Sequence, residues 1–329
     1  MAEIPFWISH LAARLRWNGG TRGALCILIY HQVLDAPSDV WPGDPDRDQF
    51  RRVMRLLARH CNVLPLPEAI DRLQAGTLPP RAVCITFDDG YRNNHDVAWP
   101  IMKALGLPAT IFVSTGFLDG GCMWNDQVIL AVHRCPASKL DLSDLGLGNH
   151  QLGGTAERRR VIDTLLRRIK YMPLRQRNEV LPVINERCAS VPPTDLMMTS
   201  DQVRSLANEG VEIGGHTVNH PILHCEDTET VEWEIRTGKR RLEEIVGHPI
   251  DSFAYPNGAP GVDFTRRDVE IVRHCGFRRA VTTRQGCAHT GAATHLLPRF
   301  HPWDRSMNKF FARLAISTLR NRAVSCDDG

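Results

Sequence analysis

The feature that most constrains this chain is a series of seven short apolar runs, most of them separated by segments of helical character. The runs occupy residues 24–30, 82–87, 109–113, 211–213, 250–255, 279–282 and 295–297. Apolar residues recur at helical spacing within residues 50–58, 97–105 and 231–246. A strand followed by a helix, repeated along a chain, is typical of parallel β/α units. We therefore predict an α/β fold whose strands close, or nearly close, into a barrel.

Each apolar run is followed by polar side chains. In order along the chain these are His31, Asp88 with Asp89, Ser114 with Thr115, His216, Asn257, Thr283 and Arg299. In (β/α) barrels, functional groups collect at the carboxyl ends of the strands. These residues are therefore the candidates for a common site.

The pattern divides the chain into three parts. Residues 1–22 form an N-terminal amphipathic segment, residues 23–300 one large domain, and residues 301–329 a C-terminal basic amphipathic helix and tail. Residues from about 118–198 interrupt the alternation of strands and helices and contain five prolines, so we expect a helical insertion there. Within it, residues 157–187 carry nine Lys or Arg against four acids, which predicts a solvated helical face or contact with an anionic glycan or phospholipid headgroup.

The C-terminal segment combines an apolar stripe with an excess of positive charge. Residues 305–322 contain no acid, and apolar residues recur there at nearly helical spacing. They are Met307, Phe310, Phe311, Leu314 and Leu319. Such a helix either packs on the barrel or lies on an anionic membrane surface.

No part of the sequence has the pattern of a membrane span or an export signal. The apolar run at 24–30 is far shorter than the roughly 20 residues that span a bilayer. Residues 1–20 mix apolar and basic side chains without a compact apolar stretch behind a basic start. We expect a cytoplasmic protein, with peripheral contact to the inner membrane as the alternative. The net charge of +3 argues against a nucleic-acid partner, which requires a concentrated basic face.

The ten cysteines show neither a CxxC pair nor regular spacing. Cys26 and Cys84 lie inside apolar runs, where a free thiol packs as a small hydrophobic group. We therefore expect reduced, buried thiols, as in cytoplasmic proteins.

Two adjacent carboxylates, Asp88 and Asp89, follow the run at 82–87, and Gly90 allows a sharp turn after them. Neighbouring side chains at a strand end point in different directions, so one can bind a metal ion while the other faces a substrate. An isolated Asp-Asp-Gly sequence is also a common turn. Its meaning depends on what else lies at the same end of the barrel.

Two histidines four residues apart, His216 and His220, follow the run at 211–213. Neutral imidazole is a common ligand of zinc and similar ions, and two His with one carboxylate leave an open position, as in catalytic sites. With 14 His in 329 residues, about 0.6 such pairs arise by chance, so the spacing alone is a weak signal. Pro221 disfavours a helix through His220, so we expect a turn that delivers both rings.

Three motifs together give a more specific indication. Residues 86–94 (TFDDGYRNN), 213–223 (IGGHTVNHPIL) and 253–258 (FAYPNG) each stand at a strand end and occur in this order. They resemble the polysaccharide deacetylase family, also described as the NodB-homology domain or carbohydrate esterase family 4, and in particular its FAYP-containing bacterial branch. The resemblance covers residues from about 26–300. It implies a distorted (β/α) barrel with about seven strands, interrupted here by the helical insertion.

By that resemblance the protein is a metal-dependent hydrolase. Asp88 matches the catalytic base of the family, and Asp89, His216 and His220 match its metal ligands. A divalent cation lowers the pKa of water towards 7, and a neighbouring carboxylate can accept the proton. Zinc is the expected ion, and Co, Ni or Mn would fit the same ligands. A backbone N–H near Asn257 would stabilise the oxyanion.

The sequence departs from the family pattern at two positions. Ala254 stands where the third motif usually has an arginine, and residues 297–299 replace a Leu-x-His sequence whose imidazole protonates the leaving amine. His31 is the candidate for that acid or for holding the base, and Arg299 is the candidate for restoring a cation near Asp88. The residues proposed for substrate binding are Tyr255, Asn257, Trp124, Asn125 and Asp126.

The expected reaction is removal of N-acetyl groups from N-acetylhexosamine units of a bacterial polysaccharide or glycan precursor. Two alternatives remain, which are hydrolysis of another small amide or O-acetyl ester on the same metal centre, and a barrel that binds glycan without turnover. The match at Asp88, Asp89, His216 and His220 favours an enzyme. The sequence gives no indication of the oligomeric state.

Overall fold

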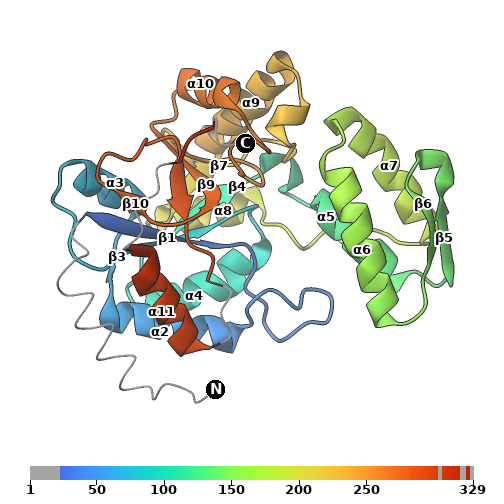
Figure 1. The fold of residues 1–329 in the computed structure, drawn as a ribbon, viewed down its shortest axis with the longest axis horizontal. Coiled ribbons are helices and arrows are strands. Elements are labelled where there is room, and N and C mark those ends of the chain that lie inside the picture. Colours follow the sequence, from blue (N-terminus) through green and yellow to red (C-terminus); the bar gives the residue numbers. More distant parts are fainter. Residues whose placement is uncertain (1–22, 303–305, 319–323, 327–329) are drawn as a thin grey trace.

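A parallel sheet that curls almost into a closed barrel forms the centre of the computed structural model, which describes residues 23–302, 306–318 and 324–326 (Figure 1). In spatial order its parallel strands are β1 (Ala24–Tyr30), β3 (Ala82–Phe87), β4 (Thr110–Val113), β7 (Glu212–Gly215), β8 (Ser252–Ala254), β9 (Arg279–Gln285) and β11 (Leu297–Arg299). They correspond to the seven apolar runs of the sequence, with ends shifted by a few residues. The predicted (β/α) barrel is confirmed.

The barrel closes where the chain leaves β11. The Phe300 N–H donates to the Ile27 carbonyl at 2.7 Å, and the Ile29 N–H donates to the Phe300 carbonyl at 3.1 Å. The residue after β11 therefore pairs with β1. Two short strands extend the sheet, because β10 (Ala288–His289) runs antiparallel to β1 and β2 (Asn62–Val63) pairs with β3. This closure brings the carboxyl ends of the parallel strands to one rim.

Successive residues of β1 belong to two different buried clusters. Leu25 and Ile27 pack with residues of other strands, such as Phe112 of β4. Cys26 and Leu28 pack in a cluster that includes many residues of the surrounding helices. Burial on both faces explains why β1 and β3 are continuous apolar runs without alternating polar residues.

Helices cover the outside of the barrel. They are α2 (Arg47–His60), α3 (Leu66–Gln74), a π-helical turn (Asn94–Ala98) that continues into α4 (Trp99–Ala104), α8 (Ser200–Asn208), α9 (Thr228–Val246), α10 (Arg266–His274) and α11 (Met307–Thr318). Short 3₁₀ turns lie at Thr115–Phe117, Ser143–Leu145 and Leu223–Cys225. α2 is typical of the set, because Asp46 caps its first N–H groups and Phe50, Val53 and Leu57 are buried along one face.

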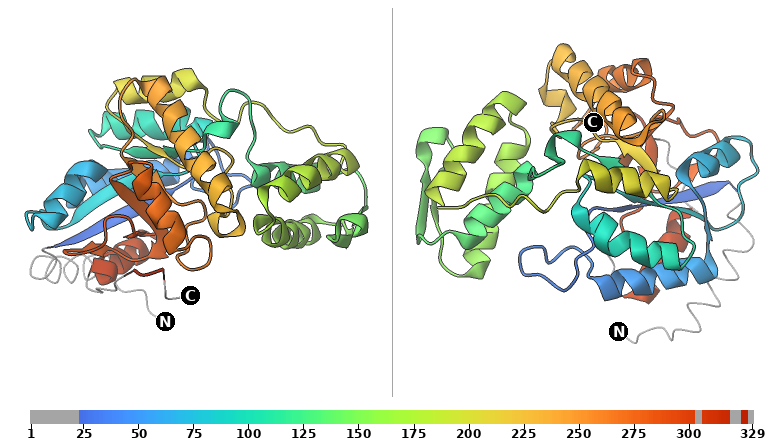
Figure 2. Two further views of the ribbon diagram at one scale, coloured as in Figure 1. Left: turned by 90° about the horizontal axis from the view of Figure 1, so that it is seen from above. Right: turned by 180° about the vertical axis from the view of Figure 1, so that it is seen from behind.

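The segment between β4 and α8 forms a lobe beside the barrel (Figures 1 and 2). It contains α5 (Trp124–Arg134), β5 (Lys139–Leu142), β6 (Gly148–Gln151), α6 (Thr155–Lys170) and α7 (Leu174–Arg187). β5 and β6 form a separate antiparallel pair. The lobe has a buried cluster of its own, including Val128, Leu165 and Leu181. We refer to residues 122–190 as the insertion.

The C-terminal helix α11 packs on the barrel. Phe310 and Leu314 are fully buried, and the Phe310 ring meets the Phe300 ring edge to face at a centroid distance of 5.8 Å. This is the packed arrangement of the two predicted for the helix, while membrane contact stays a prediction. Residues 1–22 and Leu319 lie outside the described residues. Within the described part of the chain, no helix has the length and apolar character needed to cross a membrane.

The expectation of free thiols is wrong for one pair of cysteines. Cys26 and Cys287 form a disulfide, with Cα atoms 4.5 Å apart and a sequence separation of 261. Cys26 lies on β1 and Cys287 directly precedes β10, so the pairing of these two strands brings the sulfurs together. Sequence spacing carries no information on such a contact. Because disulfides are typical of oxidising compartments, the cysteines do not support a cytoplasmic location, which stays a prediction.

Candidate metal centre and active site

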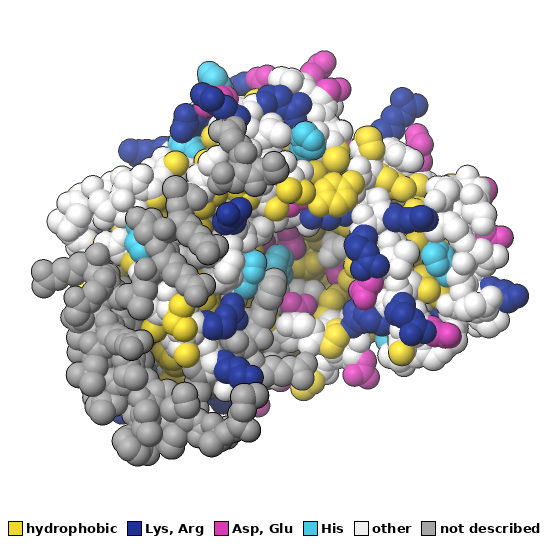
Figure 3. Space-filling view, viewed as in Figure 1, with side chains coloured by type: hydrophobic (Ala, Val, Ile, Leu, Met, Phe, Trp, Pro, Cys, Tyr) yellow, Lys and Arg dark blue, Asp and Glu magenta, His cyan; other side chains and the backbone are white. Residues whose placement is uncertain are grey.

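The rim at the carboxyl ends of the barrel strands faces the insertion across a hollow. Figure 3 shows His and acidic side chains at its floor and Lys or Arg side chains along the insertion. A cavity of about 280 Å³ lies here, with walls from both parts of the molecule. Its barrel residues are His31, Asp89, His220 and Asn257, and its insertion residues are Met123, Trp124, Asn125, Leu166, Arg167 and Lys170.

The three predicted ligands converge at the floor of this cavity. Asp89 follows β3, His216 follows β7, and His220 lies in the turn after it. Asp89 Oδ1 is 3.4 Å from His216 Nε2 and 3.4 Å from His220 Nε2. All three residues are buried, and their ligand atoms lie within 4.8 Å of one another. Among the described residues this is the one group of His, Cys, Asp or Glu that could hold a metal ion.

The hydrogen bonds around these ligands fit a bound cation. His216 Nδ1 donates to the Ala254 carbonyl at 2.7 Å, so the lone pair of its Nε2 points at Asp89. Asp89 Oδ1 is buried and has no hydrogen-bond partner among the described residues. Facing lone pairs on a nitrogen and an oxygen repel unless a positive charge lies between them. A divalent cation held by these three side chains would satisfy this need.

The electrostatics of the three ligands point the same way. Burial alone would raise the pKa of Asp89, but the adjacent His216 and His220 hold it below its usual range. Burial lowers the pKa of His220 to about 3, which keeps the ring neutral and able to act as a ligand. Burial also lowers the pKa of His216, but Asp89 and Asp88 outweigh it and the net shift is upward. The carboxylate is therefore ionised and the His220 ring neutral, which are the protonation states that a metal ligand requires.

The backbone at the site adopts conformations that side chains other than glycine rarely take. Asp89, Thr217, His220 and Asn257 have φ angles of 75°, 66°, 52° and 57°. Such residues cost of order 1–3 kcal/mol each and persist only where their surroundings hold them. Four such residues lie at one rim, so the surrounding fold imposes the orientation of their side chains against the local preference of the backbone.

A buried acid holds the turn between the two histidines. Glu234 of α9 accepts hydrogen bonds from the N–H groups of Val218 and Asn219 at 2.9 and 2.7 Å, and from the Asn219 side chain at 2.7 Å. Its side chain is fully buried. The turn passes over α9 at Gly238, where an added Cβ would lie 3.0 Å from the Thr217 backbone.

Asp88, the predicted base, is paired with Arg299. The guanidinium donates to both carboxylate oxygens, from Nη1 at 2.7 Å and from Nη2 at 2.6 Å. Arg299 is fully buried and also donates from Nε to the Thr282 carbonyl at 2.8 Å. Burial alone would raise the pKa of Asp88, but the charges of Arg299 and His216 lower it. Asp88 is therefore ionised at neutral pH, and Arg299 supplies the cation that Ala254 cannot.

His31 lies at the edge of the site. It lines the cavity that contains Asp89, and its charge lowers the pKa of both Asp88 and Asp89. It also lines a second cavity of about 770 Å³ beside Trp41 and Asp44. Burial raises the pKa of Asp44 to about 6. His31 therefore faces both cavities and lies within electrostatic range of both carboxylates.

Of the two aromatic residues proposed for substrate binding, Trp124 reaches the cavity and Tyr255 does not. Trp124 begins α5 and lines the cavity with 6% of its surface exposed. Tyr255 is fully buried, its ring stacks on Phe264 at a centroid distance of 3.8 Å, and its hydroxyl donates to the His295 carbonyl. The prediction for Tyr255 is therefore corrected, because the ring is packed in the buried layer between the sheet and the surrounding helices, where a substrate has no access.

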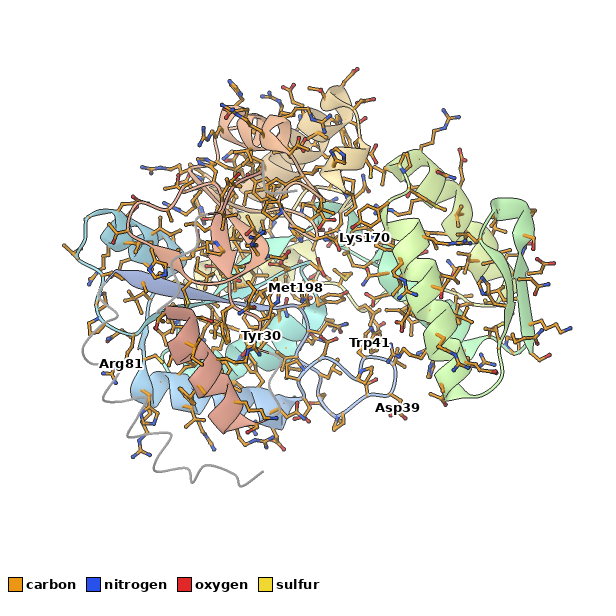
Figure 4. The ribbon with its side chains drawn as sticks, viewed as in Figure 1. Tyr30, Asp39, Trp41, Arg81, Lys170 and Met198 are labelled. Atoms are coloured by element: carbon orange, nitrogen blue, oxygen red, sulfur yellow. A yellow bond between two sulfur atoms is a disulfide. The ribbon has the colours of Figure 1, made fainter. Side chains whose placement is uncertain are left out.

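Asn125 lines the cavity, whereas the neighbouring Asp126 is turned away from it. Asp126 is fully buried and accepts hydrogen bonds from Trp41 Nε1 at 3.0 Å and the Tyr91 hydroxyl at 2.8 Å. Burial raises its pKa to about 7. Asp126 joins the insertion to the barrel and to the loop that carries Trp41, so its predicted contact with substrate is also corrected. Figure 4 shows Trp41 on the side of this loop that faces the insertion.

Two residues at the site were not found from the sequence. Glu234 lies among Val231, Ile235 and Leu242 on the apolar face of α9, and an acid in that position is a signal of a buried polar contact. Arg177 of α7 is 2% exposed and reaches the turn that carries His220. It stands in the basic stretch 157–187, where nothing distinguishes it from its exposed neighbours.

Comparison with known proteins decides the family. Residues 75–280 match the model of the polysaccharide deacetylase family. The chain belongs to this family. The match includes Asp88, Asp89, His216 and His220 and spans the insertion.

Individual relatives of this family member are distant. YxkH of Bacillus subtilis (strain 168) is 20% identical over 279 residues, which cover 84% of this chain and 70% of that protein. The poly-beta-1,6-N-acetyl-D-glucosamine N-deacetylase of Staphylococcus epidermidis is 33% identical over 73 residues, which cover 22% of this chain and 25% of that enzyme.

Solved structures share the fold. The deacetylase PplD of Streptococcus pyogenes, in complex with acetate, superposes with a TM-score of 0.60 at 18% identity, covering 90% of this chain and 99% of that one. IcaB from Ammonifex degensii superposes with a TM-score of 0.57 at 20% identity, covering 91% and 98%. At these identities the likeness concerns the fold alone.

Proposed function

We propose that this family member is a metal-dependent hydrolase that removes N-acetyl groups from N-acetylhexosamine units of a bacterial polysaccharide or glycan precursor. The observation that carries the proposal is the pairing of two sites at one rim. Asp89, His216 and His220 can hold a divalent cation, and the ionised Asp88 lies beside them with Arg299 behind it. The local match to an N-acetylglucosamine deacetylase supports the choice of an N-acetylated glycan.

A divalent cation at this site, with zinc as the first choice and Co, Ni or Mn as alternatives, would supply Lewis acidity toward water and the acetyl carbonyl. Asp88 accepts the proton of the attacking water, and Arg299 keeps that carboxylate ionised and oriented. His31, which lines the cavity, gives a proton to the leaving amine. A backbone N–H near Asn257 donates to the oxyanion, and Trp124 and Asn125 hold the sugar.

An acetate-release assay with defined metals tests the proposal. We expect acetate from N-acetylated chitooligosaccharides and little from O-acetylated xylan. A preference for xylan would assign an esterase, and glycan binding without acetate from either substrate would assign a binding protein.

Substitution of the three ligands tests the metal site directly. Asp89→Ala, His216→Ala and His220→Ala should each abolish activity and bound metal together, because each removes one of three protein ligands. Elemental analysis of the purified variants is the measurement. A stoichiometric metal in all three variants would refute the assignment.

A further inference from the structure

One buried arginine of the insertion contacts the turn that carries His220. Arg177 lies on α7, yet its guanidinium donates from Nη1 to the His220 carbonyl at 2.9 Å and from Nη2 to the Asn219 carbonyl at 2.5 Å. Its side chain is 2% exposed. Charged hydrogen bonds from a planar guanidinium are directional, so they fix the plane of the peptides that accept them.

Arg177 is itself held in place. Its guanidinium lies over the Trp124 ring at 5.2 Å, which ties α7 to the start of α5. The N-terminus of α7 is also tied to the barrel, because the Leu174 N–H donates to Glu226 Oε1 at 2.6 Å. Arg177 is therefore a fixed part of the interface between insertion and barrel.

Two side chains of opposite charge bind the backbone of the turn, one at its N–H groups and the other at its carbonyls. Glu234 of the barrel accepts from the N–H groups of Val218 and Asn219, and Arg177 of the insertion donates to the carbonyls of Asn219 and His220. The turn needs such restraint, because His220 has a φ of 52°.

The two histidines differ in how their rings are oriented. The Nδ1 of His216 donates to the Ala254 carbonyl, which is the usual way a ligand ring is held. The buried Nδ1 of His220 has no hydrogen-bond partner among the described residues. The direction of the His220 ring is therefore set by its backbone, and Arg177 binds that backbone directly.

We propose that Arg177 is a positioning residue for the metal centre. By holding the Asn219 and His220 carbonyls it aims His220 Nε2 at the position shared with Asp89 and His216. The insertion is then part of the metal site, although it contributes no ligand. The inference rests on the proposed function only in requiring that Asp89, His216 and His220 bind a metal ion.

Metal affinity of the unloaded protein tests the inference. Arg177→Met keeps the length of the side chain and removes its donors, and we expect zinc to bind about 10- to 100-fold more weakly, the range typical of lost outer contacts around a ligand. Arg175→Met, on the same helix and with 93% of its side chain exposed, is the matched control and should bind zinc normally. Competition with a chromophoric chelator measures both constants.

The outcomes separate this inference from the proposed function. If the wild-type protein binds no zinc, cobalt, nickel or manganese, the metal site itself is refuted. If the wild type binds zinc and a folded Arg177→Met variant binds it equally well, the positioning role is overturned. Loss of thermal stability in the unloaded variant with unchanged zinc affinity would mark a purely structural role and equally overturn it.

A second variant covers the case in which Arg177→Met does not fold. Arg177→Lys keeps the charge, but a single ammonium group cannot reproduce the two directed bonds of the guanidinium. We expect zinc affinity between those of the wild type and of the Met variant. A folded Lys variant with wild-type affinity would overturn the inference.

Discussion

The barrel and the insertion supply residues to the same cavity in different ways. In the barrel, site residues follow strands, with Asp88 and Asp89 after β3, His216 after β7 and Arg299 at the end of β11. In the insertion they come from helix faces, at the start of α5 and along α6 and α7. The order of parallel strands determines where the barrel residues lie, whereas the insertion residues depend on how one lobe docks on another.

The chemical character of the two contributions also differs. The barrel provides the candidate ligands, which are buried and lie within 4.8 Å of one another, and the base, which is paired with Arg299. The insertion provides a wall with Trp124, Arg167 and Lys170, and one positioning contact through Arg177. Figure 4 places Lys170 at the edge of α6 that faces the barrel, where it pairs with Asp263 at 2.9 Å. We infer that barrel residues hold the metal ion and carry the reaction, while insertion residues contribute to recognition and, through Arg177, to metal affinity.

The largest effect is expected from Arg299→Gln, which leaves Asp88 buried without its partner. Breaking a buried ion pair costs about 3–5 kcal/mol, and we expect the free energy of unfolding at pH 7 to fall by this amount in denaturant titrations. Arg284→Gln, at an exposed position on β9, is the control. A loss equal to that of the control would mean that the pair contributes no stability.

The Arg299→Gln variant should also differ from the wild type in how its stability depends on pH. In the wild type the folded pKa of Asp88 is lowered, so the ion pair stabilises the protein above the unfolded pKa of about 3.9 and this contribution is lost as pH falls through the folded pKa. Without Arg299, burial raises the folded pKa, so the variant loses stability as pH rises. The acid limb of kcat/KM should also move to higher pH.

Asp88→Asn should retain the metal and lose activity by about 100-fold or more, the scale of a lost general base. Acetate release and elemental analysis on the same preparation provide the two measurements. A rate close to that of the wild type would assign the base to another residue.

His31→Ala should slow amide substrates at least about 10-fold more than activated esters, because a good leaving group needs no proton. The ratio of the two rates, compared with that of the wild type, is the quantity to measure. Equal loss on both substrates would indicate that His31 orients other groups and is not the acid.

The smallest effect is expected from Arg167→Gln in the insertion. Arg167 lines the cavity and forms no ion pair among the described residues. An exposed charge contributes up to about 1 kcal/mol, so KM for an N-acetylated oligosaccharide that carries a carboxylate should rise by up to about fivefold. KM for a neutral oligosaccharide should not change. The neighbouring Arg168→Gln, outside the cavity, is the control, and the same change in both variants would exclude a local contact.

The sequence by itself determined the barrel and the candidate ligands. Seven apolar runs with polar ends specify the strands and the rim at which Asp88, Asp89 and His216 meet. Parallel β/α units place the carboxyl ends of all strands at the same rim of the barrel. The family motifs then assigned roles to these residues. The helical spacing of residues 50–58 and 231–246 likewise predicted α2 and α9, since a buried helical stripe is a local property of the sequence.

Only the tertiary structure decided which other residues meet at the site. The disulfide joins Cys26 and Cys287, which are 261 residues apart, and depends on the pairing of β1 with β10. Tyr255 and Asp126 have polar groups that suit a sugar, but packing turned them into the interior. Arg177 and Arg175 are two positions apart in one basic stretch, yet one is buried against the turn of His220 and the other is exposed. An arginine carries the same charge at every position of a sequence, but its role depends on the residues that the tertiary structure places around it.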